Sequence, residues 1–137
     1  MNTRYLRVKK SLLPGAGKGL FTTRPIKKGE CIVEYKGRIR KWKDVKHEDG
    51  YNGYLMYLSS QTVIDAQPAI NTKGRYANDA RGLIRVKGLR NNCTYVQVGR
   101  KCFIEATRNI LPGEEILVHY GDAFWRLQAK LARLKHP

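Results

Sequence analysis

The chain alternates short β-prone runs with turn residues, and this punctuation limits it to small sheets. Candidate strands cover residues 5–9, 31–35, 95–98, 101–106 and 115–120, and residues 53–66 form two more around a turn at Ser59 to Gln61. Gly99 and Arg100 separate two of these runs, which is typical of a hairpin. The pattern predicts a mostly β domain built of short strands.

Only the C-terminal residues have a helical pattern. Asp122 can cap a first turn, and Phe124, Leu127, Leu131 and Leu134 recur at helical spacing, so a helix is predicted over 122–135. Residues 67–92 are rich in turn formers. A stretch of that length in a small domain is either a functional loop or contains a strand that the pattern misses.

The length and cysteine content favour one intracellular domain over residues 1–137. The 137 residues are 42% hydrophobic, enough for a real core. No apolar run approaches the roughly 20 residues of a membrane helix, and the first residues lack an apolar signal segment. Cys31, Cys93 and Cys102 form no C-x-x-C pair, which favours a reducing compartment and predicts neither a disulfide framework nor a metal site.

Charge is the strongest signal in the composition. Lys and Arg number 27 against 11 acids, a formal net charge of +16, and they are spread along the whole chain. Such a surface attracts polyanions or acidic proteins, with nucleic acid as the first candidate. The alternative is a basic face that serves only solubility.

The segment GAGKGLF, residues 15–21, looks like a phosphate loop but lacks two of its parts. A Walker A loop needs Ser or Thr after its lysine, whereas Gly19 follows Lys18. The loop must also open a helix, and Pro25 and Gly29 argue against one. The segment is therefore not predicted to bind ATP.

Four segments in order resemble the SET domain, the fold of most protein lysine methyltransferases. They are GKGLF with IKKGE (17–21, 26–30), YLMYL with IDA (54–58, 64–66), RYAND (75–79) and ILPGEEILVHYG (110–121). The resemblance extends over residues 7–125, and the absence of cysteine-rich zinc-binding flanks is similar to small viral and microbial SET proteins. It implies a β-clip-like fold of small sheets with a pseudoknot and a C-terminal α-helix.

The resemblance also implies methyl transfer from S-adenosylmethionine to a protein lysine, leaving S-adenosylhomocysteine and using no metal. Tyr120 matches the catalytic tyrosine. The residues implied on the cofactor side, with Tyr120 among them, are Gly17, Lys18, Gly19, Leu20, Tyr54, Arg75, Asn78, Asp79 and Trp125. The candidates for the substrate lysine channel are Tyr57, Val118, Phe124 and Trp125.

The chain departs from the family pattern at three places. Asp79 stands where the family usually has histidine, and a carboxylate accepts hydrogen bonds but cannot donate them. An insertion, residues 80–91, carries Arg81, Arg85, Lys87 and Arg90, and it is either a basic contact surface or a solvated hairpin. Val118 stands where many relatives have a second tyrosine, which leaves room for more than one methyl group.

The substrate implied by the resemblance and the charge is a histone or another basic protein that travels with nucleic acid. The competing interpretation is a SET scaffold of weak or no activity that acts as a nucleic-acid-binding or chromatin-binding module. A homodimer is a further option. The expected compartment is nuclear or chromatin-associated in a eukaryote or virus, and the cytoplasm or nucleoid in a bacterium.

Overall fold

The computed structural model describes residues 2–48, 52–81 and 85–120. The strands and short helices are β1 (Leu6–Lys10), β2 (Lys18–Thr22), β3 (Cys31–Glu34), β4 (Arg38–Lys41), α1 (Trp42–Val45), η1 (Lys46–Glu48), β5 (Leu55–Tyr57), β6 (Thr62–Asp65), η2 (Gly74–Tyr76), β7 (Cys93–Val98), β8 (Lys101–Ala106) and β9 (Glu115–Ile116). Within these ranges the strands form three antiparallel sheets, ordered β1-β2-β9, β3-β8-β7 and β4-β6-β5. The prediction of a mostly β chain of small sheets is confirmed.

The first two sheets enclose the main core. β2 lies between β1 and β9, with Leu20 opposite both Val8 and Ile116. The β7–β8 hairpin closes at Gly99, whose φ of +62° is a conformation that glycine adopts without steric cost. The largest fully buried side chains of this core are Leu6, Leu20, Ile26, Ile32, Ile104, Ile110, Ile116 and Val118.

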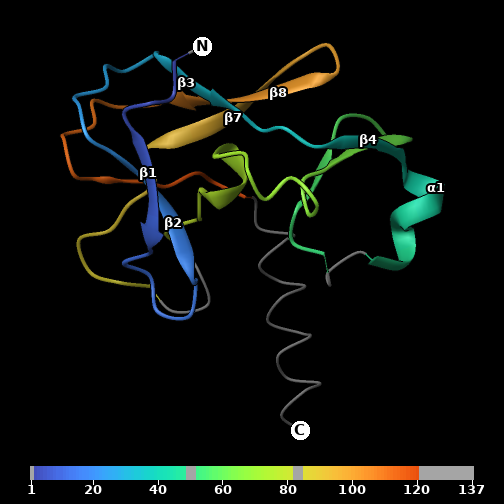
Figure 1. Cartoon of the computed structure of the whole chain (residues 1–137), viewed down its shortest axis with the longest axis horizontal. Coiled ribbons are helices and arrows are strands. Elements are labelled where there is room, and N and C mark those ends of the chain that lie inside the picture. The colour runs from blue at the N-terminus through green and yellow to red at the C-terminus, as the bar shows by residue number, and fades with distance from the viewer. Residues whose placement is uncertain (1, 49–51, 82–84, 121–137) are drawn as a thin grey trace, which may run out of the picture.

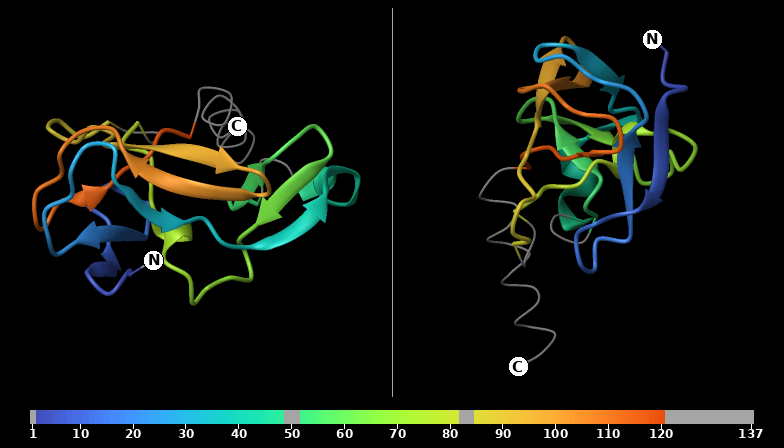
Figure 2. Two further views of the ribbon diagram at one scale, coloured as in Figure 1. Left: turned by 90° about the horizontal axis from the view of Figure 1, so that it is seen from above. Right: turned by 90° about the vertical axis from the view of Figure 1, so that its left-hand side faces the viewer.

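The third sheet projects to one side of the molecule, where β4 runs into α1 (Figure 1). β6 is its central strand and pairs with β4 and β5. Figure 2 shows β4 and the hairpin of β5 and β6 continuing away from the β7–β8 hairpin. A smaller cluster of Tyr35, Ile64, Ala66 and Cys102 joins the third sheet to the second.

The segment after β9 lies between two parts of the chain that precede it. The Val118 N–H donates to the Asn78 carbonyl, and the Leu117 carbonyl accepts from the N–H groups of Asn92 and Cys93. The side-chain amide of Asn92 adds two contacts, to the Glu115 carbonyl and to the Leu117 N–H. Residues 117 and 118 are therefore hydrogen-bonded to Asn78 on one side and to Asn92 and Cys93 on the other. This places Tyr120 beside residues 77–79.

Several elements differ from the prediction. The glycine segment enters a strand at Lys18, because its residues pair with β1 and β9 in the fold. β4 and α1 were not predicted, since the basic run from Arg38 to Lys46 has no clear hydrophobic period. The predicted strand 115–120 is only β9 long, because beyond Ile116 its partners are Asn78 and Cys93 in isolated bridges. The predicted helix 122–135 lies outside the described residues.

Candidate functional site

The glycine segment presents its main chain to open space at one end. Gly15 and Gly17 have φ angles of +73° and +69°, and a methyl group placed on either would meet no atom within 4 Å. The Lys18 carbonyl then accepts a hydrogen bond of 3.0 Å from the side-chain amide of Asn78. The glycine segment and residue 78, which are 60 positions apart in sequence, therefore lie side by side.

Gly19 is required for a different reason, which lies inside the protein. A Cβ at this position would clash with Oε2 of Glu115, whose side chain is buried. That carboxylate accepts from the Ser11 hydroxyl at 2.7 Å and from the Leu12 N–H at 3.0 Å, and Asn78 Nδ2 lies 3.5 Å away. Glu115 thus joins the glycine segment, its preceding turn and Asn78.

Tyr120 is held at two points by residues just before and just after Asn78. Its hydroxyl donates to the Ala77 carbonyl at 2.6 Å, and its N–H donates to Oδ2 of Asp79 at 2.8 Å. Burial raises the pKa of Tyr120 well above its ordinary value, and the Asp79 carboxylate raises it further. The hydroxyl therefore stays protonated at neutral pH.

Asp79 is a buried carboxylate whose two oxygens accept hydrogen bonds from several donors. Oδ1 accepts from the Arg81 N–H and from the Asn91 side-chain amide, each at 2.9 Å. Oδ2 accepts from Tyr120 and lies 3.9 Å from His119 Nδ1. The aspartate therefore has a structural task in this chain that depends on accepting hydrogen bonds.

Aromatic rings continue from Tyr120 into the second sheet. The Tyr95 ring stacks on Tyr120 with 6.5 Å between centroids, and Tyr35 meets Tyr95 edge-on at 5.9 Å. Tyr54 packs against the same cluster, and the Tyr35 hydroxyl donates to its carbonyl. We call Tyr35, Tyr54, Tyr95 and Tyr120 the tyrosine cluster.

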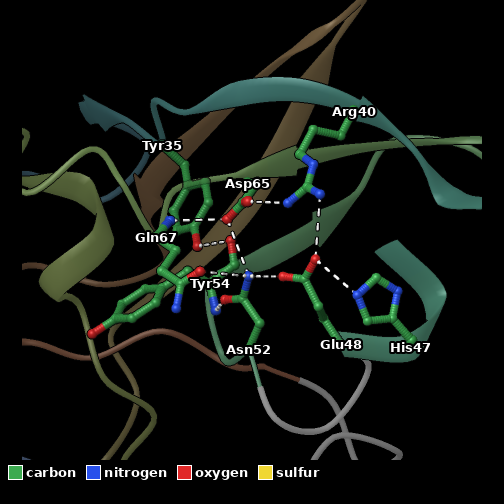
Figure 3. A network of polar contacts seen from close by, with 8 residues as sticks. All are labelled: Tyr35, Arg40, His47, Glu48, Asn52, Tyr54, Asp65 and Gln67. Carbon is green, nitrogen blue, oxygen red and sulfur yellow. Dashed lines mark hydrogen bonds and ion pairs between the residues drawn. The ribbon is translucent and has the colours of Figure 1, made fainter. Parts of the chain in front are cut away.

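Arg75 and a polar network hold Tyr54 in place. The Arg75 guanidinium lies 3.9 Å from the Tyr54 ring centroid and donates to the Gln67 carbonyl. Around the main chain of Tyr54, the network shown in Figure 3 connects β4, η1 and the end of β6. Its hydrogen bonds and ion pairs join Tyr35, Arg40, His47, Glu48, Asn52, Tyr54, Asp65 and Gln67.

The fold brings most of the predicted site residues together but not all of them. Tyr57 packs on Trp42, and half of its surface is exposed. The side chains of Leu20 and Val118 lie in the main core. Phe124 and Trp125 lie outside the described residues.

Sequence reasoning missed three contributors to this site. Glu115 carried a weak signal, since it is an acid directly before the apolar run Ile116 to Val118. Tyr95 gave only the signal of an aromatic residue in a strand. The Ala77 carbonyl gave no signal, because every residue has a main-chain carbonyl and the sequence does not mark which one is used.

Two classes of feature are not found in the part of the chain that the structure describes. Residues 2–48, 52–81 and 85–120 contain no cluster of three or more His, Cys, Asp or Glu side chains that could hold a metal ion. Among the same residues, none of the helices has the length and hydropathy needed to cross a bilayer.

Comparison with known proteins places this arrangement in a family. The SET domain model matches residues 17–121. N-lysine methyltransferase KMT5A-A of Danio rerio is 31% identical over 80% of this chain and 34% of its own length. Histone-lysine N-methyltransferase EZH2 of Chaetomium thermophilum is 33% identical over 89% of this chain and 8% of its own length.

A solved structure agrees with the sequence comparison. The methyltransferase domain of human PR domain-containing protein 2 superposes with a TM-score of 0.62 at 26% identity, covering 88% of this chain and 79% of that one. This chain spans about a third of the length of the KMT5A relatives that it matches. With residues 17–121 matched and the glycine segment, Asn78 and Tyr120 brought together, the chain belongs to the SET domain family.

Proposed function

We propose that the protein transfers a methyl group from S-adenosylmethionine to the side-chain amine of a lysine in a protein substrate. The observation that carries the proposal is the junction at residues 77–78. The Ala77 carbonyl fixes the Tyr120 hydroxyl, and the next side chain, Asn78, fixes the glycine segment. A methyl donor held by the glycine segment and an amine held by Tyr120 would therefore meet at neighbouring residues.

The residues on the cofactor side fit S-adenosylmethionine in type. The open space beside Gly15 and Gly17 lets a ligand approach main-chain groups, and Asn78 and Lys18 offer an amide and a carbonyl for the polar amino-acid end. We include Arg75 and Tyr54, which contact each other, on the match of their segments to the family. We include Gly19, Leu20 and Asp79 through their main chain, and Trp125 as predicted from the sequence. When bound, the sulfonium supplies an electrophilic methyl group.

Tyr120 acts in this proposal by orienting the amine. The Tyr120 hydroxyl donates its hydrogen bond to the Ala77 carbonyl. Its oxygen can therefore accept a hydrogen bond from a lysine amine. Its raised pKa makes it unsuited to remove a proton at neutral pH. The Tyr120 side chain therefore raises the rate by positioning the amine.

The tyrosine cluster suits an incoming lysine. Aromatic faces attract an ammonium group, and a site with little water favours the neutral amine, whose lone pair must attack. Tyr95 and Tyr35 supply these faces next to Tyr120. Val118, together with Tyr57, Phe124 and Trp125, was predicted for the channel, and a small residue at 118 is proposed to permit more than one methylation.

The substrate class follows from the names of the relatives. Matched proteins are called N-lysine and histone-lysine methyltransferases. We propose a histone-like or other nucleic-acid-associated basic protein as the substrate, in the nucleus or nucleoid according to the host. The net charge of +16 would repel a basic substrate alone, so nucleic acid or an acidic partner would bridge the two.

The test is methyl transfer from labelled S-adenosylmethionine to histones and to whole lysate by wild type and by Tyr120→Phe. Losing one orienting hydrogen bond should lower kcat/KM roughly ten- to hundred-fold. Tyr5→Phe, which removes a hydroxyl outside the site, is the matched control and should retain wild-type activity. Equal labelling by Tyr120→Phe and wild type would exclude the role of Tyr120.

A second candidate function is favoured by Asp79 and by the basic charge. A SET scaffold without catalysis could bind nucleic acid or chromatin as its whole task. Calorimetry with S-adenosylmethionine separates the two: measurable binding together with methyl transfer supports the enzyme. No binding, combined with salt-dependent DNA binding, supports the scaffold.

A further inference from the structure

The insertion that follows Asp79 forms one wall of a hollow of about 410 Å³. Four cationic residues line it, three of them exposed, together with His119. The described residues that line it are Ala80, Arg81, Arg85, Val86, Lys87, Leu89, Arg90, Asn91 and His119. The basic residues of the insertion therefore face a common space.

The described part of this wall is anchored to the domain. Val86 and Leu89 pack on the buried cluster of Leu13, Ala80 and Leu117, and the Leu89 N–H closes a turn onto the Val86 carbonyl. Val86 and Leu89 thus point inward. The cations between them, Arg85, Lys87 and Arg90, are exposed.

Both ends of the insertion are also clamped. The Ala80 N–H donates to the side chain of Asn91 at 2.8 Å, and Asn91 in turn donates to Asp79. The cations are therefore presented from a fixed frame, so binding an anion would cost less ordering entropy than it would on a solvated tail.

Arg85, Lys87 and Arg90 share the hollow with no acidic residue among the described residues that line it. The Asp79 carboxylate, next to the lining residue Ala80 in sequence, is itself buried and accepts from Arg81, Asn91 and Tyr120. Clustering like charges is unfavourable unless an anion binds between them. Arginine favours phosphate in particular, because its planar fork can donate two parallel hydrogen bonds.

We propose that this hollow binds the phosphodiester backbone of nucleic acid. No Phe, Tyr or Trp side chain is among the described residues that line it, so it lacks the large aromatic ring on which a nucleotide pocket commonly stacks a base. Backbone binding carries no sequence preference and agrees with the net charge of +16. The inference does not depend on methyl transfer.

The test is the anisotropy of a labelled mixed-sequence DNA duplex, titrated with the full chain at several salt concentrations and without S-adenosylmethionine. Arg85→Gln/Arg90→Gln should weaken binding and lower the slope of log K against log salt by about 1.8, the value for two lost phosphate contacts. Arg100→Gln/Lys101→Gln removes the same charge at the exposed turn between β7 and β8 and should leave the slope unchanged within error. A second duplex of different sequence should bind equally well.

Other outcomes would overturn the proposal. Equal losses of DNA affinity in both double variants would show that the effect comes from net charge alone. Displacement of the duplex by AMP or inorganic phosphate at micromolar concentration would assign the hollow to a small phosphate ligand. Tighter binding of polyglutamate than of DNA, lost in Arg85→Gln/Arg90→Gln, would assign it to an acidic protein. Methyl transfer to a peptide, assayed separately, should be unchanged in both variants, so failure here and failure of the proposed activity are distinguishable.

Discussion

Asp79 accepts hydrogen bonds from groups on three segments, and no neutral side chain of its size can do the same. Its carboxylate has two oxygens and no proton, whereas an asparagine offers one oxygen and an NH₂ group. The resemblance to the family raised the question of what an aspartate does where histidine is usual. The structure answers that it fastens Tyr120 and the insertion to residue 79.

Asp79→Asn should therefore destabilise the protein by about 1–3 kcal/mol, because at least one buried donor loses its acceptor. Asp79→His should be at least as unfavourable, although histidine is the residue typical of the family. Urea denaturation at pH 7 measures both changes. Wild-type stability in Asp79→His would show that the hydrogen bonds of the carboxylate are dispensable.

Gly19 gives a second prediction at the residue scale. In Gly19→Ala the new methyl group meets the Glu115 carboxylate, and overpacking of this kind costs about 1–3 kcal/mol. Gly53→Ala is the matched control, since its methyl group would meet no atom within 4 Å. Thermal unfolding of the two variants should give a clearly lower Tm for Gly19→Ala only. Binding of S-adenosylmethionine should also weaken in this variant, because the collision displaces the glycine segment.

Among the elements, the third sheet depends on a buried carboxylate at the end of its central strand. Asp65 lies at the end of β6 and pairs with Arg40 of β4 at 2.7 Å. Burial alone would raise its pKa, but hydrogen bonds from the Gln67 N–H, Arg40 and Asn52 outweigh this effect, so the pKa of Asp65 is lowered. The ionised form is therefore the one that the folded state stabilises.

The ionised Asp65 makes the stability of the folded state depend on pH. A lowered folded-state pKa gives stability that is fully present above the unfolded pKa, near 3.9, and that is lost as pH falls through the folded value. Asp65→Asn should cost about 1–3 kcal/mol at pH 7 and should lose less stability than wild type between pH 5 and pH 2. Urea denaturation across this range checks it, with the exposed Asp44→Asn as control. Parallel pH profiles for Asp65→Asn and wild type would contradict the assignment.

The same elements show how far the sequence reached. β3, the β5–β6 pair and the β7–β8 hairpin were predicted because each has β-prone residues between turn formers that the fold uses as turns. β4 was missed because its burial is slight: it is held by pairing with β6 and by Arg40. A strand stabilised by its partner leaves little hydrophobic pattern in its own residues.

For the whole molecule, repulsion between basic residues lowers the stability of the folded state. With 27 basic and 11 acidic residues, like charges outnumber opposite ones, and compact folding brings them closer. Screening shortens the range of this repulsion from about 30 Å at 0.01 M salt to about 8 Å at 0.15 M. The folded state should gain more from screening than the expanded unfolded chain.

Raising NaCl from 10 mM to 300 mM should therefore increase the Tm, and the increase should be smaller in a variant with several exposed lysines changed to glutamine. Differential scanning calorimetry at fixed pH measures both. A Tm that falls with added salt would mean that attractive pairs such as Arg24–Glu30 and Arg40–Asp65 outweigh the repulsion.

The sequence by itself determined the family, the mostly β character and the residues expected to carry the chemistry. Turn residues act on the backbone locally, so their effect can be predicted from neighbouring residues. The glycines, Asn78 and Tyr120 are residue types that a sequence motif specifies directly. The basic charge likewise follows from the composition alone.

Only the tertiary structure decided which of these residues meet. Contacts between segments apart in the sequence decide the role of the Ala77 carbonyl and the hydrogen bonds of Asp79. They also decide the clash that a Cβ at Gly19 would make with Glu115 and the packing of Tyr57 on Trp42. Hydrogen bonds and steric limits of this kind are made across the fold, and a linear pattern carries no record of the partner.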